Sequence, residues 1–418
     1  MRDSQALLPE MLAPEQAIVA FFARARLAAP LIEYVGLADA WSRILARDAR
    51  AAEPHPSHDR STMDGFAVAS AGGSSRRRIV GEVRMGAAAP RAIGLDETLR
   101  IPTGGALPPG ADAVVPFEDV REHDGTIEPT GPVEQGAFVT LAASDMRAGE
   151  CALEAGRRIG PAELGVLATL GFASVPVFRR PRFGIVSTGD ELISPSRTPE
   201  LGEIRDSNRY AIGGMLQGFG CEVEHGPAAL DDFESIRDAA LTLLKRCDGV
   251  VLTGGSSVGA RDLVPRVVAT LGAPGPIVHG IRLKPGKPTL LAAVGDKPVI
   301  GLPGNPTSAL VVLDAVARPI VAHCTGERPS VRAHVDAVAD EAFVGREGWT
   351  WYVPAQLHAV DGRWHAKPLR IHSAHVALLA RASGYVAVGE RPARVEIGES
   401  VRVVRLGSND GIVLEQPA

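Results

Sequence analysis

The feature that most constrains the fold is an alternation of short apolar strands, glycine-rich loops and helices between residues 181 and 326. Apolar runs at 183–186, 250–252 and 299–302 are each followed by a loop rich in Gly, Ser, Thr or Pro. Helical patterns come after these loops. Strands that alternate with helices imply a parallel sheet with helices on both faces. We therefore expect a doubly wound α/β domain here.

Local signals place the helices of this domain. Asp206 or Ser207 can cap the start of a helix that ends at Gly220, because short polar side chains accept backbone N–H bonds at a helix start and glycine favours its end. Asp231, with Glu234 three residues later, resembles a capping box. The pair therefore predicts the start of the next helix.

The loops after the strands are expected to meet, because the carboxyl ends of parallel strands lie at one edge of the sheet. Backbone N–H groups and helix N-termini at such an edge bind anions such as phosphate. None of the loops is a Walker A or GxGxxG motif, so the pattern indicates an anionic ligand without specifying a nucleotide. The candidate binding residues are Thr188, Gly189, Thr253, Gly254, Gly255, Ser257, Gly259, Pro303, Gly304, Asn305 and Pro306.

A second feature is the segment 284–288, Lys-Pro-Gly-Lys-Pro, which places two cations on a proline-fixed turn between two apolar strands. Lysines at strand ends are often solvated residues that protect an edge. Here the prolines restrict the backbone that carries both ammonium groups, and the Pro-Gly-Asn-Pro loop follows shortly afterwards. We therefore expect Lys284 and Lys287 to contact a phosphorylated ligand.

Carboxylates accompany the same loops. Asp190 and Glu191 follow the first strand, Asp206 stands near Asn208, and Asp262 comes after the second loop. Asp206 and Asp262 could equally cap helices, and this alternative stays open. Carboxylates beside a phosphate site suit Mg²⁺, because the ion takes oxygen ligands and bridges to phosphate oxygens. We therefore predict Asp190, Glu191, Asp206 and Asp262 as metal ligands.

The rest of the 418-residue chain predicts further domains, since a domain usually holds about 100–200 residues. Residues 11–50 have helical spacing and are expected to form one or two amphipathic helices. Short strands separated by Gly and Pro indicate a β-rich domain over 51–144. A helix is expected at 161–173, and period-two alternation from about residue 329 predicts a small C-terminal β-barrel or sandwich.

Composition excludes several classes of partner. The 44 basic and 49 acidic residues give a net charge of −5, which opposes binding to nucleic acid or to an anionic membrane. The one basic run, 76–78, is expected to begin a solvated strand. The four scattered cysteines lack zinc spacing and fit a reducing compartment. The N-terminus does not resemble a secretion signal, and no apolar run reaches the ~18 residues of a membrane helix, so we expect a cytoplasmic protein.

Motifs in order along the chain carry a family resemblance. They are 61–68 (STMDGFAV), 102–106 (PTGGA) with 109–115 (PGADAVV), 187–192 (STGDEL), 206–208 (DSN), 253–262 (TGGSSVGARD), 284–288 (KPGKP) and 301–306 (GLPGNP). Together they resemble the molybdopterin molybdenumtransferase (MoeA) family, and a shared fold alone does not account for so many ordered matches.

The resemblance implies a multidomain α/β plus β protomer. Its parts would be a helical and extended linker domain (1–50 with 145–180), an inserted β-rich domain (51–144), a doubly wound α/β molybdopterin-binding domain (181–328) and a C-terminal β domain (329–418). It also implies an elongated homodimer, whose cleft combines the α/β domain of one subunit with the β-rich domain of the other. This arrangement would explain why Asp64 and Thr103 lie so far in sequence from the phosphate loops.

The implied reaction inserts molybdate into adenylylated molybdopterin, gives molybdenum cofactor and AMP, and requires a divalent metal such as Mg²⁺. The glycine loops and both lysines would hold the pterin phosphate and pyrophosphate, with Asp206 and Asn208 contacting polar ligand groups. The molybdopterin adenylyltransferase would be a protein partner. The implied catalytic residues are Asp59, Asp64, Thr103, Asp190, Glu191 and Asp262.

Three segments depart from the family pattern. Arg60 stands where the family often has Asn, Gly280 lies near a position that is commonly basic, and 141–144 lacks the usual Arg and Gly. Such changes suit an altered oxyanion preference, for example tungstate. Two alternatives stay open: a molybdopterin adenylyltransferase, which the flanking β domains argue against, and a non-catalytic molybdopterin-binding scaffold.

Overall fold

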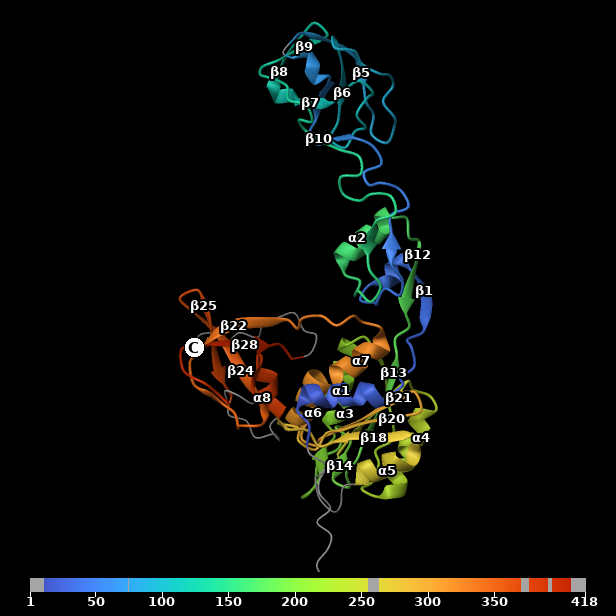
Figure 1. Cartoon of the computed structure of the whole chain (residues 1–418), viewed down its shortest axis with the longest axis vertical. Helices are drawn as coiled ribbons and strands as arrows, with labels where there is room; N and C mark the ends of the chain where they lie inside the picture. The colour runs from blue at the N-terminus through green and yellow to red at the C-terminus, as the bar shows by residue number, and fades with distance from the viewer. Residues whose placement is uncertain (1–10, 74, 255–262, 370–375, 390–392, 407–418) are drawn as a thin grey trace, which may run out of the picture.

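The computed structural model describes residues 11–73, 75–254, 263–369, 376–389 and 393–406. The protein is elongated (Figure 1). A β-rich domain lies at one end, a small linker domain follows, and the α/β domain and a C-terminal β domain lie side by side at the other end. The expected fold class, multidomain α/β plus β, is confirmed.

The α/β domain is built on a six-stranded sheet in the order β16-β13-β17-β21-β20-β18. Its first four strands are parallel, as expected, whereas β20 runs antiparallel to both of its neighbours, β21 and β18. The turn at Gly295, where φ is +60°, joins β20 directly to β21 as a hairpin, and a hairpin can only be antiparallel. The strands are β13 Arg182–Ser187, β16 Glu222–His225, β17 Gly249–Thr253, β18 Pro274–His279, β20 Leu290–Val294 and β21 Lys297–Leu302.

Helices cover both faces of this sheet. Alternate strand residues point to opposite sides, so Ile185 and Val251 join one core and Val186 and Leu252 the other. The first core packs under α1 Pro14–Arg24, α3 Asn208–Gly218, α6 Pro306–Val312 and α7 Arg318–Thr325. The second packs under α4 Phe233–Leu244 and α5 Leu263–Leu271. Helix α1, expected in the linker domain, thus packs on the α/β core.

Helix boundaries follow the predicted signals closely. Helix α3 ends just before Gly220, whose φ is +94°. Helix α4 is capped by Asp232, whose carboxylate accepts the Ser235 N–H at 2.8 Å, so the predicted cap at Asp231 is wrong by one residue.

Helices α6 and α7 are joined through a π-helical turn, Leu313–Ala317, into one long helix. Among the described residues, this helix over Pro306–Thr325 is long and apolar enough to cross a membrane by length and composition. The apolar 18-residue window within it is 61% buried inside the protein. Its apolar composition is therefore explained by packing in the core of the α/β domain.

The linker domain contains one helix, α2 Pro161–Thr169, which confirms the helix predicted at 161–173. It also contains a 3₁₀ turn, Leu37–Ala40, and two short antiparallel pairs. The pairs are β1 Ile32–Gly36 with β12 Ser174–Phe178, and β2 Ala49–Arg50 with β11 Cys151–Leu153. The second helix considered for 11–50 is wrong, because Pro30 interrupts a helix and the residues after it alternate in exposure as a strand does.

The β-rich domain has a six-stranded sheet in the order β7-β4-β6-β5-β9-β8, beside the pair β3–β10. Within the predicted solvated run, Arg77 is fully buried, and its guanidinium donates to the carbonyls of Ser75, Ala69 and Gly73. The strands are β3 Arg60–Ser61, β4 Gly65–Val68, β5 Arg77–Glu82, β6 Glu97–Ile101, β7 Ala113–Pro116, β8 Val120–His123, β9 Thr126–Pro129 and β10 Val139–Thr140.

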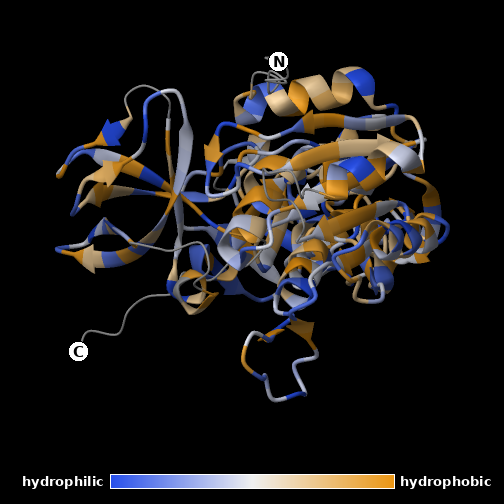
Figure 2. Ribbon diagram, turned by 90° about the horizontal axis from the view of Figure 1, so that it is seen from below, coloured by the Kyte–Doolittle hydropathy of each residue, from blue (hydrophilic) through white to orange (hydrophobic). Residues whose placement is uncertain are grey.

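The C-terminal domain is a closed barrel, because β24 pairs with both β25 and β26 and so completes a ring of strands. It forms a separate body beside the α/β domain (Figure 2). The strand β19 Leu283–Lys284 of the α/β domain adds to its edge. The ring strands are β22 His334–Ala339, β24 Thr350–Val360, β25 Arg363–Pro368, β26 Gly384–Val388 and β28 Ser400–Val404, with the pair β23 Phe343–Val344 and β27 Arg394–Val395 and helix α8 Val376–Arg381 alongside.

Candidate functional site

Loops from separate parts of the α/β domain meet at the carboxyl ends of its parallel strands, as the sequence predicts. The Thr188 N–H donates to the Thr253 carbonyl at 2.8 Å, which joins the first loop to the second. The Asn208 side-chain amide donates to the Thr253 hydroxyl at 3.0 Å and to the Gly304 carbonyl at 2.6 Å. Asn208 at the start of α3 therefore holds the second and third loops together.

Glycine is required where these loops touch. Gly254 has φ of +99°, and a Cβ built on it would lie 2.2 Å from the Thr188 carbonyl oxygen. A Cβ on Gly304 would lie 3.4 Å from the Gly254 Cα. Backbone thus approaches backbone at this edge, so a side chain at Gly254 would push the first two loops apart.

An acidic group lies beside the first loop. The Asp231 N–H donates to the Asp190 carboxylate at 3.0 Å. Burial, reinforced by the nearby carboxylates of Glu191 and Asp190, raises the pKa of Asp231. The sequence pattern suggested Asp231 only as a helix cap. The adjacent pair Asp231-Asp232 could have indicated this, because one aspartate is enough to cap the helix and the other is then available for another contact.

Asp206 does not join this acidic group. Its side chain accepts the Arg209 N–H at 3.1 Å and pairs with the Arg209 guanidinium at 3.2 Å. The carboxylate therefore satisfies the start of α3, which is the alternative left open from the sequence. In the part of the chain that the structure describes, no three His, Cys, Asp or Glu side chains are grouped closely enough to hold a metal ion by themselves.

The lysine turn lies between the α/β domain and the C-terminal barrel. The Lys284 ammonium lies 4.1 Å from the centre of the Trp351 ring, and β19 pairs with β24 at Lys284 and Trp351. The Lys287 carbonyl accepts the Ile281 N–H at 3.0 Å, which closes the turn. No sequence motif predicts that Trp351, from the barrel, lies against Lys284.

Two predicted residues form a pair in the β-rich domain. The Asp64 carboxylate accepts the Thr103 N–H at 2.7 Å and the Thr103 hydroxyl at 3.0 Å. These bonds hold the pKa of Asp64 below its usual value, so the group is ionised at neutral pH. The backbone around it is fixed, because Gly104 N–H donates to the Ser61 carbonyl at 2.7 Å. Asp59 lies close by in sequence, and its carboxylate accepts the Ala142 N–H at 2.7 Å.

These residues and the α/β loops do not meet within one chain. In Figure 1 the linker domain separates the β-rich domain from the α/β domain. The candidate residues therefore fall into two separate groups, named below the β-rich half-site and the α/β half-site after their domains. Of the remaining candidates, Asn305 and Pro306 begin α6, while Gly255, Ser257, Gly259 and Asp262 lie outside the described residues.

The departures from the family pattern have local structural roles. Arg60 pairs with Thr140 across β3 and β10, at the base of the Asp64 segment. Gly280 has φ of +81°, and its N–H donates to the Thr289 carbonyl at 2.9 Å. A side chain there would strain the backbone, so glycine at this position follows from the turn itself.

Comparison with known proteins covers nearly the whole chain. Residues 12–171 match the MoeA N-terminal region (domain I and II), residues 184–323 match a probable molybdopterin binding domain, and residues 336–406 match the MoeA C-terminal region (domain IV). A molybdopterin molybdenumtransferase of Bacillus subtilis is 30% identical over 391 residues, which is 91% of each chain. One from Staphylococcus aureus (strain COL) is 31% identical and covers 77% of this chain and 78% of its own.

A solved structure agrees. The molybdopterin biosynthesis moea protein from Pyrococcus horikosii superposes with a TM-score of 0.77 at 29% identity, and covers 95% of this chain and 99% of that one. The domain order, the converging loops and these similarities lead to one conclusion: the chain belongs to the molybdopterin molybdenumtransferase (MoeA) family of enzymes.

Proposed function

We propose that this protein inserts molybdate into adenylylated molybdopterin, and that it releases AMP and molybdenum cofactor in a reaction that depends on Mg²⁺. The observation that carries the proposal is the contact of Asn208 with both Thr253 and Gly304, which holds two of the loops together at the strand ends. The relatives named molybdopterin molybdenumtransferase support the same reaction class.

The α/β half-site binds the pterin and its phosphates. The backbone N–H groups of Gly254 and Gly304 follow β17 and β21 at the strand ends, where they can donate to phosphate oxygens. The N–H groups of Thr188 and Gly189 instead hold the first loop in place, because they donate to the carbonyls of Thr253 and Ala229. Lys284 and Lys287 add positive charge on a turn whose backbone is fixed. Thr188, Thr253 and Asn208 keep the described parts of the loops in contact, so these parts are in place before substrate arrives.

The residues around Asp190 fit a Mg²⁺ ion. The raised pKa of Asp231 reflects burial and repulsion from Glu191 and Asp190, and a cation would relieve both. Mg²⁺ usually takes one or two carboxylates together with substrate phosphates, so a complete set of protein ligands is not required. Asp190 and Glu191, with Asp262, would hold the ion. When bound, it supplies charge neutralisation at the phosphoanhydride.

The β-rich half-site acts on the other side of the anhydride. Asp64 fixes the Thr103 hydroxyl and backbone, and Asp59 fixes the loop at Ala142, so the groups hold one orientation toward a ligand. We assign Asp59, Asp64 and Thr103 to orienting molybdate or the attacking oxygen. Attack of a water or molybdate oxygen on an anhydride phosphorus then breaks the P–O bond, so that AMP leaves and the pterin keeps one phosphate. The dithiolene sulfurs of the pterin bind molybdenum in place of molybdate oxygens, which leave as water.

The separation of the half-sites supports a homodimer in which each cleft uses the α/β domain of one chain and the β-rich domain of the other. Such a dimer has two equivalent clefts by its twofold symmetry. The enzyme would work in the cytoplasm and receive its substrate from a molybdopterin adenylyltransferase.

The test is AMP release from adenylylated molybdopterin by the purified protein with Mg²⁺, with and without molybdate. Release that requires molybdate, with molybdenum retained on the pterin, supports the transferase. In the variant Asp64→Ala, turnover should fall while pterin binding persists. Tight binding without release under any oxyanion, tungstate included, would instead indicate a scaffold, and AMP transfer from ATP would indicate an adenylyltransferase.

A further inference from the structure

A cavity far from the candidate catalytic loops lies where the linker domain, the end of α3 and the connection to the barrel meet. It has a volume of about 600 Å³, which is the size of a small-molecule site. Four arginines line it, together with the exposed ring of Trp41. The arginines are Arg158, Arg318, Arg332 and Arg405.

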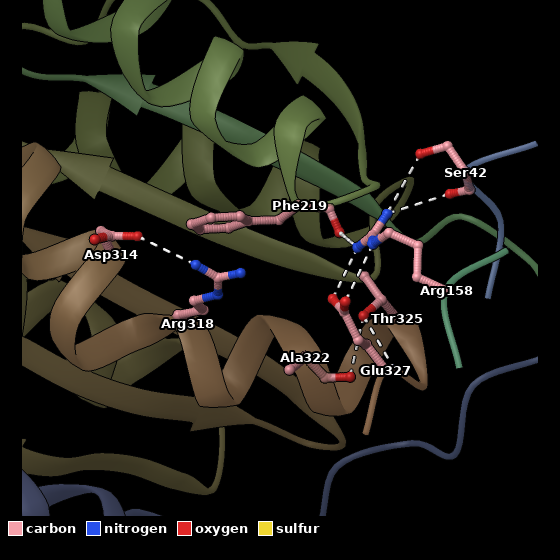
Figure 3. Close-up of polar contacts among 8 residues, drawn as sticks. All are labelled: Ser42, Arg158, Phe219, Asp314, Arg318, Ala322, Thr325 and Glu327. Atoms are coloured by element: carbon pink, nitrogen blue, oxygen red, sulfur yellow. Dashed lines mark hydrogen bonds and ion pairs between the residues drawn. The ribbon is translucent and has the colours of Figure 1, made fainter. Parts of the chain in front are cut away.

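Arg158 forms the wall that joins the three parts. Its guanidinium donates to the Ser42 carbonyl at 3.2 Å, to the Phe219 carbonyl at 3.2 Å and to both oxygens of Glu327, at 3.1 and 2.8 Å (Figure 3). Its donors and its charge are therefore used within the protein. Arg158 therefore forms part of the cavity wall, and a ligand would be bound by other residues of the lining.

Arg318 is placed differently. Its guanidinium lies 4.9 Å from the centre of the Phe219 ring and 3.6 Å from the Asp314 carboxylate. Figure 3 shows the guanidinium next to the ring of Phe219. Among the described residues it makes no hydrogen bond within 3.5 Å, although 31% of its side chain is exposed. The stacked ring thus fixes a cation whose donors remain available to a ligand.

The charge of the cavity is not balanced. Arg318 and Arg332 share one carboxylate, that of Asp314, which is fully buried. The acid that lines the cavity, Glu163, is already engaged by Arg157 at 2.7 Å and by the Gly160 N–H at 3.0 Å. Among the described residues, Arg318 and Arg332 therefore carry one more positive charge than the carboxylate that they share, and Arg318 faces the open volume.

We propose that this junction cavity binds a small molecule with two or more charged oxyanion groups, such as an organic phosphate or a polycarboxylate. Arginine suits such groups because its planar fork donates two parallel hydrogen bonds to one oxyanion. The ligand would touch the linker domain at Trp41, the end of α3, and Arg405 beyond β28. Its binding would tie these domains together, a role that is separate from the transferase reaction.

The test uses ¹⁹F NMR of the full-length protein labelled with 5-fluorotryptophan. The chain has four tryptophans, so Trp41 can be assigned by Trp41→Phe, and Trp351 reports separately on the Lys284 turn. Sodium pyrophosphate and sodium citrate are titrated in separate experiments. We expect a saturable shift of the Trp41 resonance with at least one of the two anions. Comparison of the two binding curves shows whether phosphate or carboxylate groups are preferred.

The shift should weaken at least tenfold in Arg318→Gln and in Arg405→Gln, and partly in Arg318→Lys, which keeps the charge but loses the fork. Arg402→Gln is the matched control, because Arg402 lies on β28 near Arg405 but pairs with Asp336 on the surface. An unchanged Trp364 resonance shows that each variant is folded. The absence of a Trp41 shift with both anions, or a shift of equal strength in the Gln variants, would overturn the proposal.

Discussion

Asn208 is the side chain whose removal most directly tests the convergence of the loops. In Asn208→Ala, two hydrogen bonds are lost, at 3.0 Å to the Thr253 hydroxyl and at 2.6 Å to the Gly304 carbonyl. A hydrogen bond contributes about 0.5–1.5 kcal/mol to stability, so the pair should contribute about 1–3 kcal/mol. The free energy of unfolding should fall by that amount, as measured by urea denaturation.

The same change should weaken substrate binding. If the loops are held in their binding geometry by Asn208, the loss of about 1–3 kcal/mol corresponds to a KM for adenylylated molybdopterin raised about 5- to 150-fold. The control is Gln217→Ala, an exposed amide at the other end of α3. Unfolding and KM of Asn208→Ala that both match those of the control would refute the reasoning.

Three further predictions concern single groups. Because burial raises the pKa of Asp231, the charged form of this side chain destabilises the fold as pH rises through that pKa. The variant Asp231→Asn should therefore have a higher thermal midpoint of unfolding at pH 7, and its Mg²⁺-dependent AMP release should be lower. Gly254→Ala should lower the free energy of unfolding by at least about 1–3 kcal/mol, because φ is positive and the new Cβ would contact Thr188. Gly214→Ala should not lower it, because Gly214 lies in α3 with open space around it. Denaturation curves of the two variants test this difference. Because Asp64 has a lowered pKa, its contribution is present at neutral pH and lost in acid, so Asp64→Asn should lower the unfolding midpoint at pH 7 but not at about pH 2.

The sequence predicts the parts of the fold that depend on local pattern. The apolar runs became β13, β17 and β21, and the loops after them meet, because parallel strands place their carboxyl ends together. The helix ending at Gly220 is equally local, since a positive φ favours glycine. These are features that a few neighbouring residues determine.

Long-range packing explains what the sequence did not predict. Helix α1 has an ordinary amphipathic pattern, and nothing in it shows that it packs on a core more than 150 residues away, such as Ile281 and Val316. Arg77 looks like a surface residue until loop carbonyls surround it. Trp351 likewise reaches Lys284 only because β19 joins the barrel.

The candidate site divides in the same way. Asn208, Thr253 and Gly304 were predicted from motifs and lie in contact. Asp206 was predicted as a metal ligand, yet Arg209 in the first turn of α3 pairs with its carboxylate. Asp231 was predicted only as a cap, because its closeness to Asp190 depends on a loop that returns beside β13. Spacing along the chain cannot distinguish these outcomes, since each depends on which partner lies nearest in space.

The central claim is a molybdate-inserting site shared between two chains, and subunit mixing tests it most directly. Asp64→Ala and Lys284→Ala remove one half-site each and should be inactive alone. After the two variants are unfolded and refolded together, mixed dimers contain one intact cleft, so molybdate-dependent AMP release should recover to about a quarter of the wild-type rate. A mixture that stays inactive while the wild type releases AMP would contradict the shared site. A wild type that releases no AMP with molybdate or tungstate would contradict the reaction itself.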